Sequence, residues 1–120
     1  MAKPSKAKQN ELIAKEVERW NEIFADLSDE KKGAATRLIE RVAFMTITLE
    51  ILEEDIKSRG PTYKFKNGSQ VMVIENPSQK SYNTMVNRYT VACDKLFGLL
   101  PKEDLEDAKK KAKRSANDLI

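Results

Sequence analysis

Residues 30–59 read EKKGAATRLIERVAFMTITLEILEEDIKSR and contain no proline. Apolar residues recur through this stretch at alternating intervals of three and four, and they are Ala35, Leu38, Val42, Met45, Leu49, Leu52 and Ile56. This heptad spacing predicts one long helix with an apolar seam. A second set widens the stripe toward another neighbour: Ile39, Ala43, Ile47 and Ile51. A helix of this length would span about 45 Å at 1.5 Å per residue. We therefore expect part of it to meet another subunit.

Shorter helices are expected on both sides of the long one. Upstream, residues 11–27 carry an apolar stripe on one face: Leu12, Ile13, Val17, Trp20, Phe24 and Leu27. Ser28 or Asp29 can cap the long helix that follows. Downstream, Asn76-Pro77 can start a helix, with Gln79 placed for a capping-box contact. Its seam repeats the same spacing with Tyr82, Met85, Tyr89, Ala92, Leu96 and Leu99. Two seams in one chain predict an antiparallel helical pair.

A β-hairpin is predicted over residues 62–75, where the pattern changes from helical to alternating. Gly60-Pro61 ends the long helix, and Asn67-Gly68 divides two short alternating runs. Asn-Gly favours a two-residue type I′ turn in which both residues have positive φ. Two strands alone are marginal in water. Such a hairpin needs a helix beneath it or a strand from a neighbouring chain.

The expected fold is therefore mainly α: a long antiparallel helical hairpin with an N-terminal helix, a small β-hairpin insertion and a charged C-terminal helix. Residues 1–9 are expected to be a flexible basic arm, because they combine proline, serine and lysine without an apolar period. Residues 10–100 form the core and oligomerisation domain. Residues 101–120 form the charged helix or tail, which has few apolar residues with which to dock.

Composition excludes most familiar enzyme chemistry. The chain has no histidine and one cysteine, Cys93, so it lacks His-based acid–base catalysis, Ser–His and Cys–His pairs, and multi-ligand zinc sites. Its four glycines are too widely spaced for a phosphate-binding loop. The acidic run at 50–55 resembles a metal site only superficially. We expect no catalytic residue, no metal and no cofactor, and a small hydrolase would have no candidate nucleophile.

No stretch without a charged residue is longer than that from Val42 to Leu49, which is far shorter than the roughly 20 residues of a membrane span. The basic N-terminus has no apolar segment behind it and does not read as a secretory signal. We therefore expect a soluble, cytoplasmic protein without a membrane partner.

Three basic clusters are candidates for contact with DNA phosphates. The first lies near the start of the long helix and consists of Lys31, Lys32, Arg37 and Arg41. The second lies on the hairpin and consists of Lys64 and Lys66. The third lies in the tail and consists of Lys109, Lys110, Lys113 and Arg114. Each has a simpler interpretation as a solvated helix face or as turn chemistry. Trp20 could stack on a base, but its place in the apolar stripe favours a core role. A helix-turn-helix is conceivable, although its second helix would be far too long for a recognition helix.

The order of signals after residue 38 resembles one known family. A long helix ends in Lys57-Ser-Arg-Gly60, a hairpin follows, Glu75-Asn-Pro77 opens a helix, and Phe97-Gly98-Leu99-Leu100-Pro101 closes it. This order is similar to that of phage terminase small subunits of the P27-like family, whose closing signature reads leucine-glycine-leucine-threonine-proline. The chain departs from that signature at Phe97 and Leu100.

The resemblance implies an oligomeric ring that binds double-stranded viral DNA and regulates the large terminase subunit, which carries the ATPase and nuclease. It transfers no catalytic or DNA-contacting residue. The alternative is an α-helical scaffold or adaptor that binds a protein partner and never touches nucleic acid. A net charge of +3 is compatible with either function.

Overall fold

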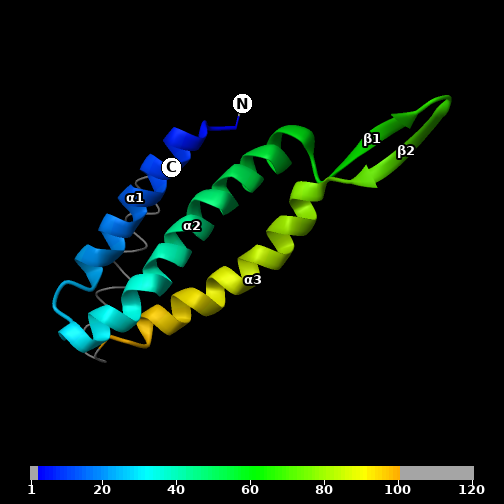
Figure 1. Ribbon diagram of the computed structural model, residues 1–120. Coiled ribbons are helices and arrows are strands. Elements are labelled where there is room, and N and C mark those ends of the chain that lie inside the picture. Colours follow the sequence, from blue (N-terminus) through cyan, green and yellow to red (C-terminus); the bar gives the residue numbers. More distant parts are fainter. Residues whose placement is uncertain (1–2, 101–120) are drawn as a thin grey trace.

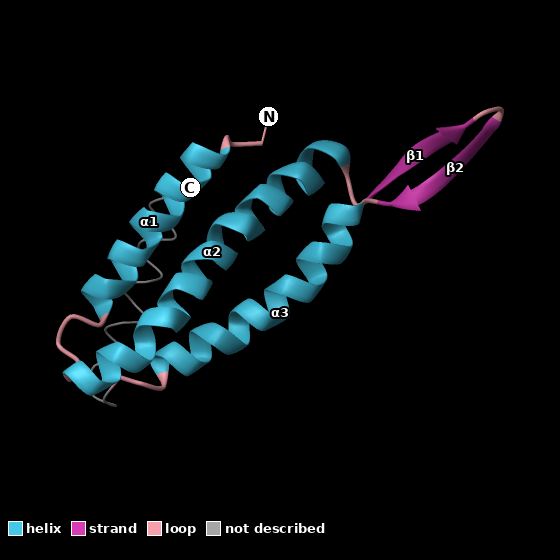
Figure 2. Ribbon diagram, in the orientation of Figure 1, coloured by secondary structure: helices cyan, strands magenta, loops and turns pink. Residues whose placement is uncertain are grey.

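The computed structural model describes residues 3–100, which form three helices and one two-stranded antiparallel sheet (Figures 1 and 2). In chain order the elements are α1 (Lys6–Ile23), α2 (Asp29–Arg59), β1 (Thr62–Asn67), β2 (Gln70–Glu75) and α3 (Pro77–Phe97). This confirms the predicted mainly helical fold with a β-hairpin inserted in a long helical hairpin. The expected C-terminal helix and its basic cluster lie outside the described residues.

The molecule is elongated, with extents of 63 × 27 × 24 Å. α2 packs against both α1 and α3, and it lies between them in Figure 1. The β1–β2 ribbon continues from the end of the α2–α3 pair and projects beyond the helices. Within residues 3–100, no helix combines the length and the apolar character that a bilayer crossing needs.

The apolar core lies where all three helices meet, and it consists of Trp20, Phe24, Leu27, Ala35, Ile39, Val42, Ala92 and Leu96. The indole of Trp20 stacks on Phe24, with ring centroids 6.1 Å apart, and lies 5.6 Å from the Phe97 ring. Trp20 is therefore the core anchor that its periodic position predicted.

The two predicted seams pack within one chain. Five seam residues are buried: Ala35, Val42, Leu49, Ala92 and Leu96. The others are partly buried: Leu38, Met45, Leu52, Ile56, Tyr82, Met85, Tyr89 and Leu99. A seam that is half covered inside the monomer does not by itself require another subunit. Assembly through these residues stays a prediction.

The prediction of a flexible arm over residues 1–9 is wrong from Lys6 onward. α1 begins at Lys6 because Ser5 caps it, and the Ser5 Oγ accepts a hydrogen bond from the Lys8 amide at 3.1 Å. The helix also ends earlier than predicted, at Ile23 instead of residue 27. Phe24 and Leu27 nevertheless stay buried, because the turn after the helix folds their side chains into the core. The predicted Ser28 cap of α2 is confirmed.

The hairpin has the predicted strands but a different turn. Asn67 pairs with Gln70, so the two-residue loop is Gly68-Ser69 rather than Asn67-Gly68. Gly68 has φ +63°, and none of the described non-glycine residues has a positive φ. Glycine at the first loop position with an ordinary second residue fits a type II′ turn. The type I′ prediction is therefore wrong, because it counted Asn67 as a loop residue.

Asn76 joins the ribbon to the helical pair and is completely buried. Its Oδ1 caps α3 by accepting from the Ser78 amide at 3.0 Å. Its Nδ2 donates to the Gly60 carbonyl at 3.0 Å and to Asp55 Oδ2 at 3.1 Å. The side chain thus ties the end of α2 to the start of α3. The predicted capping box does not form, since Gln79 donates its side-chain amide to Asn83 instead.

Candidate nucleic-acid interface

A groove runs between α2 and α3. Its larger hollow has a volume of about 470 Å³ and is lined by Arg41, Phe44, Met45, Lys80, Ser81, Thr84, Met85 and Arg88. A second hollow of about 320 Å³ shares Arg88 and is lined also by Leu38, Asn87, Val91, Ala92 and Lys95. We call the two together the α2–α3 groove. Met45, Met85 and Leu38 are partly buried and form its apolar floor.

Every charged residue that lines the groove is basic: Arg41, Lys80, Arg88 and Lys95. None of these four side chains forms an ion pair with another residue in the part of the chain that the structure describes. Five cations outside the groove do have acidic partners; Lys15, for example, pairs with Glu11 at 3.4 Å and Arg19 with Glu16 at 2.8 Å. Lys31, Lys32, Lys64 and Lys66 form no ion pair within residues 3–100, as in the groove, but they line neither of its hollows. The groove therefore keeps an unbalanced positive charge that an external anion can neutralise.

The groove also exposes apolar side chains. Phe44 is 53% exposed and Val91 is 54% exposed, whereas the neighbouring floor residues are partly covered. Along α3 the cations from Lys80 to Lys95 span about 22 Å at 1.5 Å per residue. That is about two thirds of one turn of B-DNA. A ligand here would meet a row of cations with an aromatic ring beside them.

Only part of the predicted DNA-binding set comes together in this groove. Arg41 lines it, and Arg37 lies one turn away along α2. Lys31 and Lys32 are exposed in the first turn of α2, and Lys64 and Lys66 are exposed on the ribbon at the opposite end of the molecule (Figure 1). The ribbon lysines therefore do not form one continuous surface with the cations at the start of α2 within a single chain. The tail residues Lys109, Lys110, Lys113 and Arg114 lie outside the described residues.

Sequence reasoning missed the contribution of α3, namely Lys80, Arg88 and Lys95. Their spacings of eight and seven residues place them on one face of a helix. The signal is present in the sequence, but it consists of isolated cations and not of a dense basic run. Cations two turns apart on one helix are as informative as a cluster of neighbouring lysines.

A second polar group is buried where α1, α2 and α3 meet. Glu16 is only 6% exposed, and burial raises the pKa of its carboxyl group although Arg19 opposes that shift. Arg19 Nη1 lies 2.8 Å from Glu16 Oε2, a contact that is ionic but not an aligned hydrogen bond. Burial also raises the pKa of Glu50, and the nearby carboxylates of Glu16 and Glu53 raise it further. Of these side chains only Glu16 is buried, and it lies beside the core.

Tyr89 and Cys93 lie beside this group on α3. Burial raises the pKa of Tyr89 to about 12, and its hydroxyl accepts a hydrogen bond from Thr46 Oγ1 at 3.2 Å. Burial raises the pKa of the Cys93 thiol as well, which keeps it protonated and a poor nucleophile. Among residues 3–100, no three Cys, Asp or Glu side chains are grouped in a way that could hold a metal ion.

Comparison of the chain with known protein families, with curated proteins and with solved structures finds no match.

Proposed function

We propose that this chain is the small terminase subunit of a tailed phage or prophage. In this proposal it is an oligomeric component of the genome-packaging motor that recognises double-stranded viral DNA and modulates the large subunit, in the cytoplasm of the host. The observation that carries the DNA-binding part is the α2–α3 groove, where four unpaired cations line one face. The resemblance in the order of helix, hairpin, Asn-Pro start and closing signature supports the family.

DNA would lie along the groove with its phosphates beside Arg41, Lys80, Arg88 and Lys95. Contacts of this kind release condensed counterions, so affinity falls steeply as salt rises. They carry no sequence information by themselves. Repetition of the groove in an oligomer would add weak contacts into a useful affinity, because later contacts on the same duplex are intramolecular.

The test is a titration of labelled duplex DNA at several salt concentrations with the wild type and with Arg41→Ala/Arg88→Ala. Loss of two phosphate contacts should reduce the slope of log affinity against log salt by about 1.8 per protomer engaged. The matched control is Lys8→Ala/Lys15→Ala, which removes two cations of α1 that already pair with Glu11. Equal slopes for the wild type and the groove variant would contradict the proposal.

A second function is favoured by the exposed apolar side chains of the groove. Phe44 and Val91, framed by cations, are also suited to the apolar face of an acidic helix from a protein partner. In that case the chain would be an adaptor, and duplex DNA would not bind at any salt concentration. Phe44→Ala distinguishes the two, because it should abolish capture of a helical partner but reduce DNA affinity only modestly.

A further inference from the structure

The β1–β2 ribbon lacks the support that a small sheet needs. It is a two-stranded sheet, and all of its residues are exposed except Tyr63 and Ile74, which are partly covered. Two-stranded ribbons without a covering layer are marginal in water. Within the described chain, only the base of the ribbon is held, by Asn76 and by the Arg59 guanidinium 4.4 Å from the Tyr63 ring centroid. The outer part of the ribbon is available to a neighbouring molecule.

One face of the ribbon combines positive charge with apolar surface. Lys64 pairs across the strands with Val73, and Lys66 pairs with Val71. Alternate residues of a strand point to opposite faces, so these four side chains share one face, with Thr62 and Glu75 on the same face at the base of the ribbon. Val71 is 59% exposed and Val73 is 68% exposed, so neither is covered within its own chain. We call this the lysine face of the ribbon.

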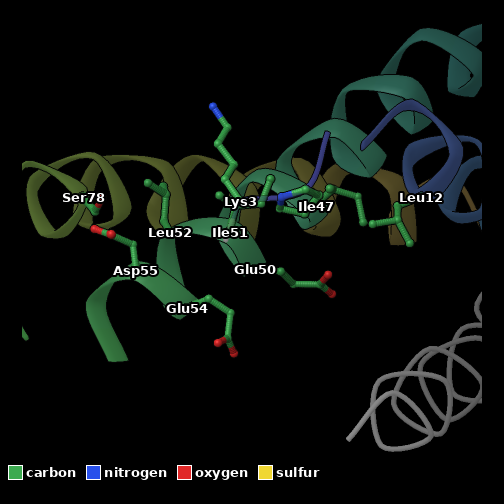
Figure 3. A pocket seen from close by; sticks show the side chains of 10 residues that line it. Lys3, Leu12, Ile47, Glu50, Ile51, Leu52, Glu54, Asp55 and Ser78 are labelled. Carbon is green, nitrogen blue, oxygen red and sulfur yellow. The ribbon is translucent and has the colours of Figure 1, made fainter. Parts of the chain in front are cut away.

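A hollow with the complementary chemistry lies between the N-terminal part of α1, α2 and the start of α3 (Figure 3). Its volume is about 480 Å³, within the usual range of ligand pockets. Apolar side chains alternate with acidic ones in its lining, which includes Leu12, Ile47, Ile51, Leu52, Glu50, Glu54 and Asp55, with Lys3 as its one cation. We call it the acidic hollow.

Two of the three carboxylates in the acidic hollow are available to a new cation. Asp55 is already engaged, because it accepts from Asn76 and lies 3.7 Å from Arg59. Glu50 forms no ion pair within residues 3–100, and Glu54 has only an exposed contact with Lys57 at 3.8 Å. Glu50 and Glu54 are one turn apart, and their side chains leave α2 on the same side in Figure 3. The raised pKa of Glu50, caused by burial and nearby carboxylates, means that a cation docked beside it would be favourable.

A ribbon cannot reach the acidic hollow of its own chain, because it points away from the helices (Figure 1) and its base is fixed by Asn76. We propose that the lysine face of one copy docks into the acidic hollow of the next copy, with Lys64 and Lys66 facing Glu50 and Glu54 and the two valines on the apolar lining. The contact joins two different surfaces, so it repeats head to tail and forms a ring where the rotation closes. The inference rests on the oligomeric part of the proposed function and names its surfaces.

Charge exchange between two variants tests this contact. The ribbon variant is Lys64→Glu/Lys66→Glu, and the hollow variant is Glu50→Lys/Glu54→Lys. The molar mass of each is measured without DNA by light scattering after size-exclusion chromatography, and circular dichroism verifies that each is folded. Each variant alone should have a smaller mass than the wild-type oligomer. An equimolar mixture should form oligomers again, because each ribbon then meets a hollow of opposite charge on the other variant.

The matched control is Lys31→Glu/Lys32→Glu, which makes the same change in charge on the first turn of α2 and should keep the wild-type mass. A monomeric wild type, a ribbon variant with unchanged mass, or a mixture that fails to reassemble would each overturn the inference. The DNA titration with Arg41→Ala/Arg88→Ala is independent of this result. A chain that assembles through charge exchange but never binds DNA would support the contact and refute the proposed DNA function.

Discussion

Replacing Asn76 by alanine removes a cap and two bridging hydrogen bonds from one buried side chain. Loss of an N-cap costs about 1 kcal/mol. Loss of the hydrogen bonds to the Gly60 carbonyl and to Asp55 costs roughly 0.5–1.5 kcal/mol for a neutral partner and more for a charged one. We therefore expect Asn76→Ala to lower the free energy of unfolding by about 3–5 kcal/mol. This is a large share of the stability of an ordinary small domain.

Asn76→Asp separates the cap from the bridge. The new carboxylate can still accept from the Ser78 amide, but it can no longer donate, and it faces Asp55 Oδ2 where the present contact is 3.1 Å. Two carboxylates so close cannot both ionise easily, so one pKa of the pair is raised in the folded state. A raised folded pKa means that the penalty is present at neutral pH and is relieved as pH falls through that pKa.

The wild type should respond to acid in the opposite direction. Hydrogen bonds from Ser78 and Asn76 hold the pKa of Asp55 below its usual range, so the stability that this carboxylate contributes is lost as pH falls. The difference in the free energy of unfolding between Asn76→Asp and the wild type should therefore become smaller from pH 7 to pH 4. Urea unfolding monitored by circular dichroism at 222 nm measures the stability of each Asn76 variant relative to the wild type. All samples should have the same protein concentration, because assembly adds to apparent stability. Two results would refute the reasoning. One is a loss of unfolding free energy below about 0.5 kcal/mol for Asn76→Ala, which is the lower limit for a cap alone. The other is a difference between Asn76→Asp and the wild type that becomes larger in acid.

The remaining predictions concern the core and the buried carboxylate. Leu96 is fully buried at the junction of the helices, so Leu96→Ala should lower the free energy of unfolding in urea by about 2–5 kcal/mol. Val91→Ala, on the exposed side of α3, should change it by no more than about 0.5 kcal/mol. Similar losses for both variants would contradict the location of the core. Glu16→Gln should raise Tm at pH 7, because burial raises the pKa of Glu16 and the folded state carries a charge that it disfavours. This gain in Tm should become smaller as pH falls toward 4, because the wild-type carboxyl then becomes protonated. A gain in Tm that is independent of pH would show that the charge of Glu16 is not its cause.

The helices and the ribbon were predictable because local signals agree with the tertiary structure. The alternating steps of three and four from Ala35 to Ile56 and the second apolar set widen the apolar surface of α2, and the structure packs α2 against both α1 and α3. Gly60 has φ +84°, as a helix end before proline requires. Where local signals compete, sequence reasoning failed. Asn67-Gly68 favours one turn type, but the strand register, which depends on pairing over all six positions, assigns Asn67 to the strand.

The candidate site was less predictable than the fold. Density of basic residues does not identify the groove, because Lys31 and Lys32 are adjacent and exposed but line neither of its hollows. Arg41 and Arg88 are 47 positions apart and share one hollow because α2 and α3 run antiparallel. Whether a residue of α2 meets a residue of α3 depends on the length of the β-insertion and on the rotation of each helix about its axis. Neither quantity can be read from charge spacing, so the approach of Arg41 to the α3 cations emerges only in three dimensions.

The uneven distribution of apolar packing along the 63 Å axis has a consequence for how the molecule opens. Most of the buried side chains gather where α1, α2 and α3 meet, while the ribbon end is held mainly by polar contacts around Asn76. Amide protons should therefore exchange with solvent fastest in β1 and β2, more slowly near the start of α3, and slowest around Val42 and Leu96. Fraying from one end would let the ribbon adjust its shape to a neighbour while the opposite end keeps its native packing.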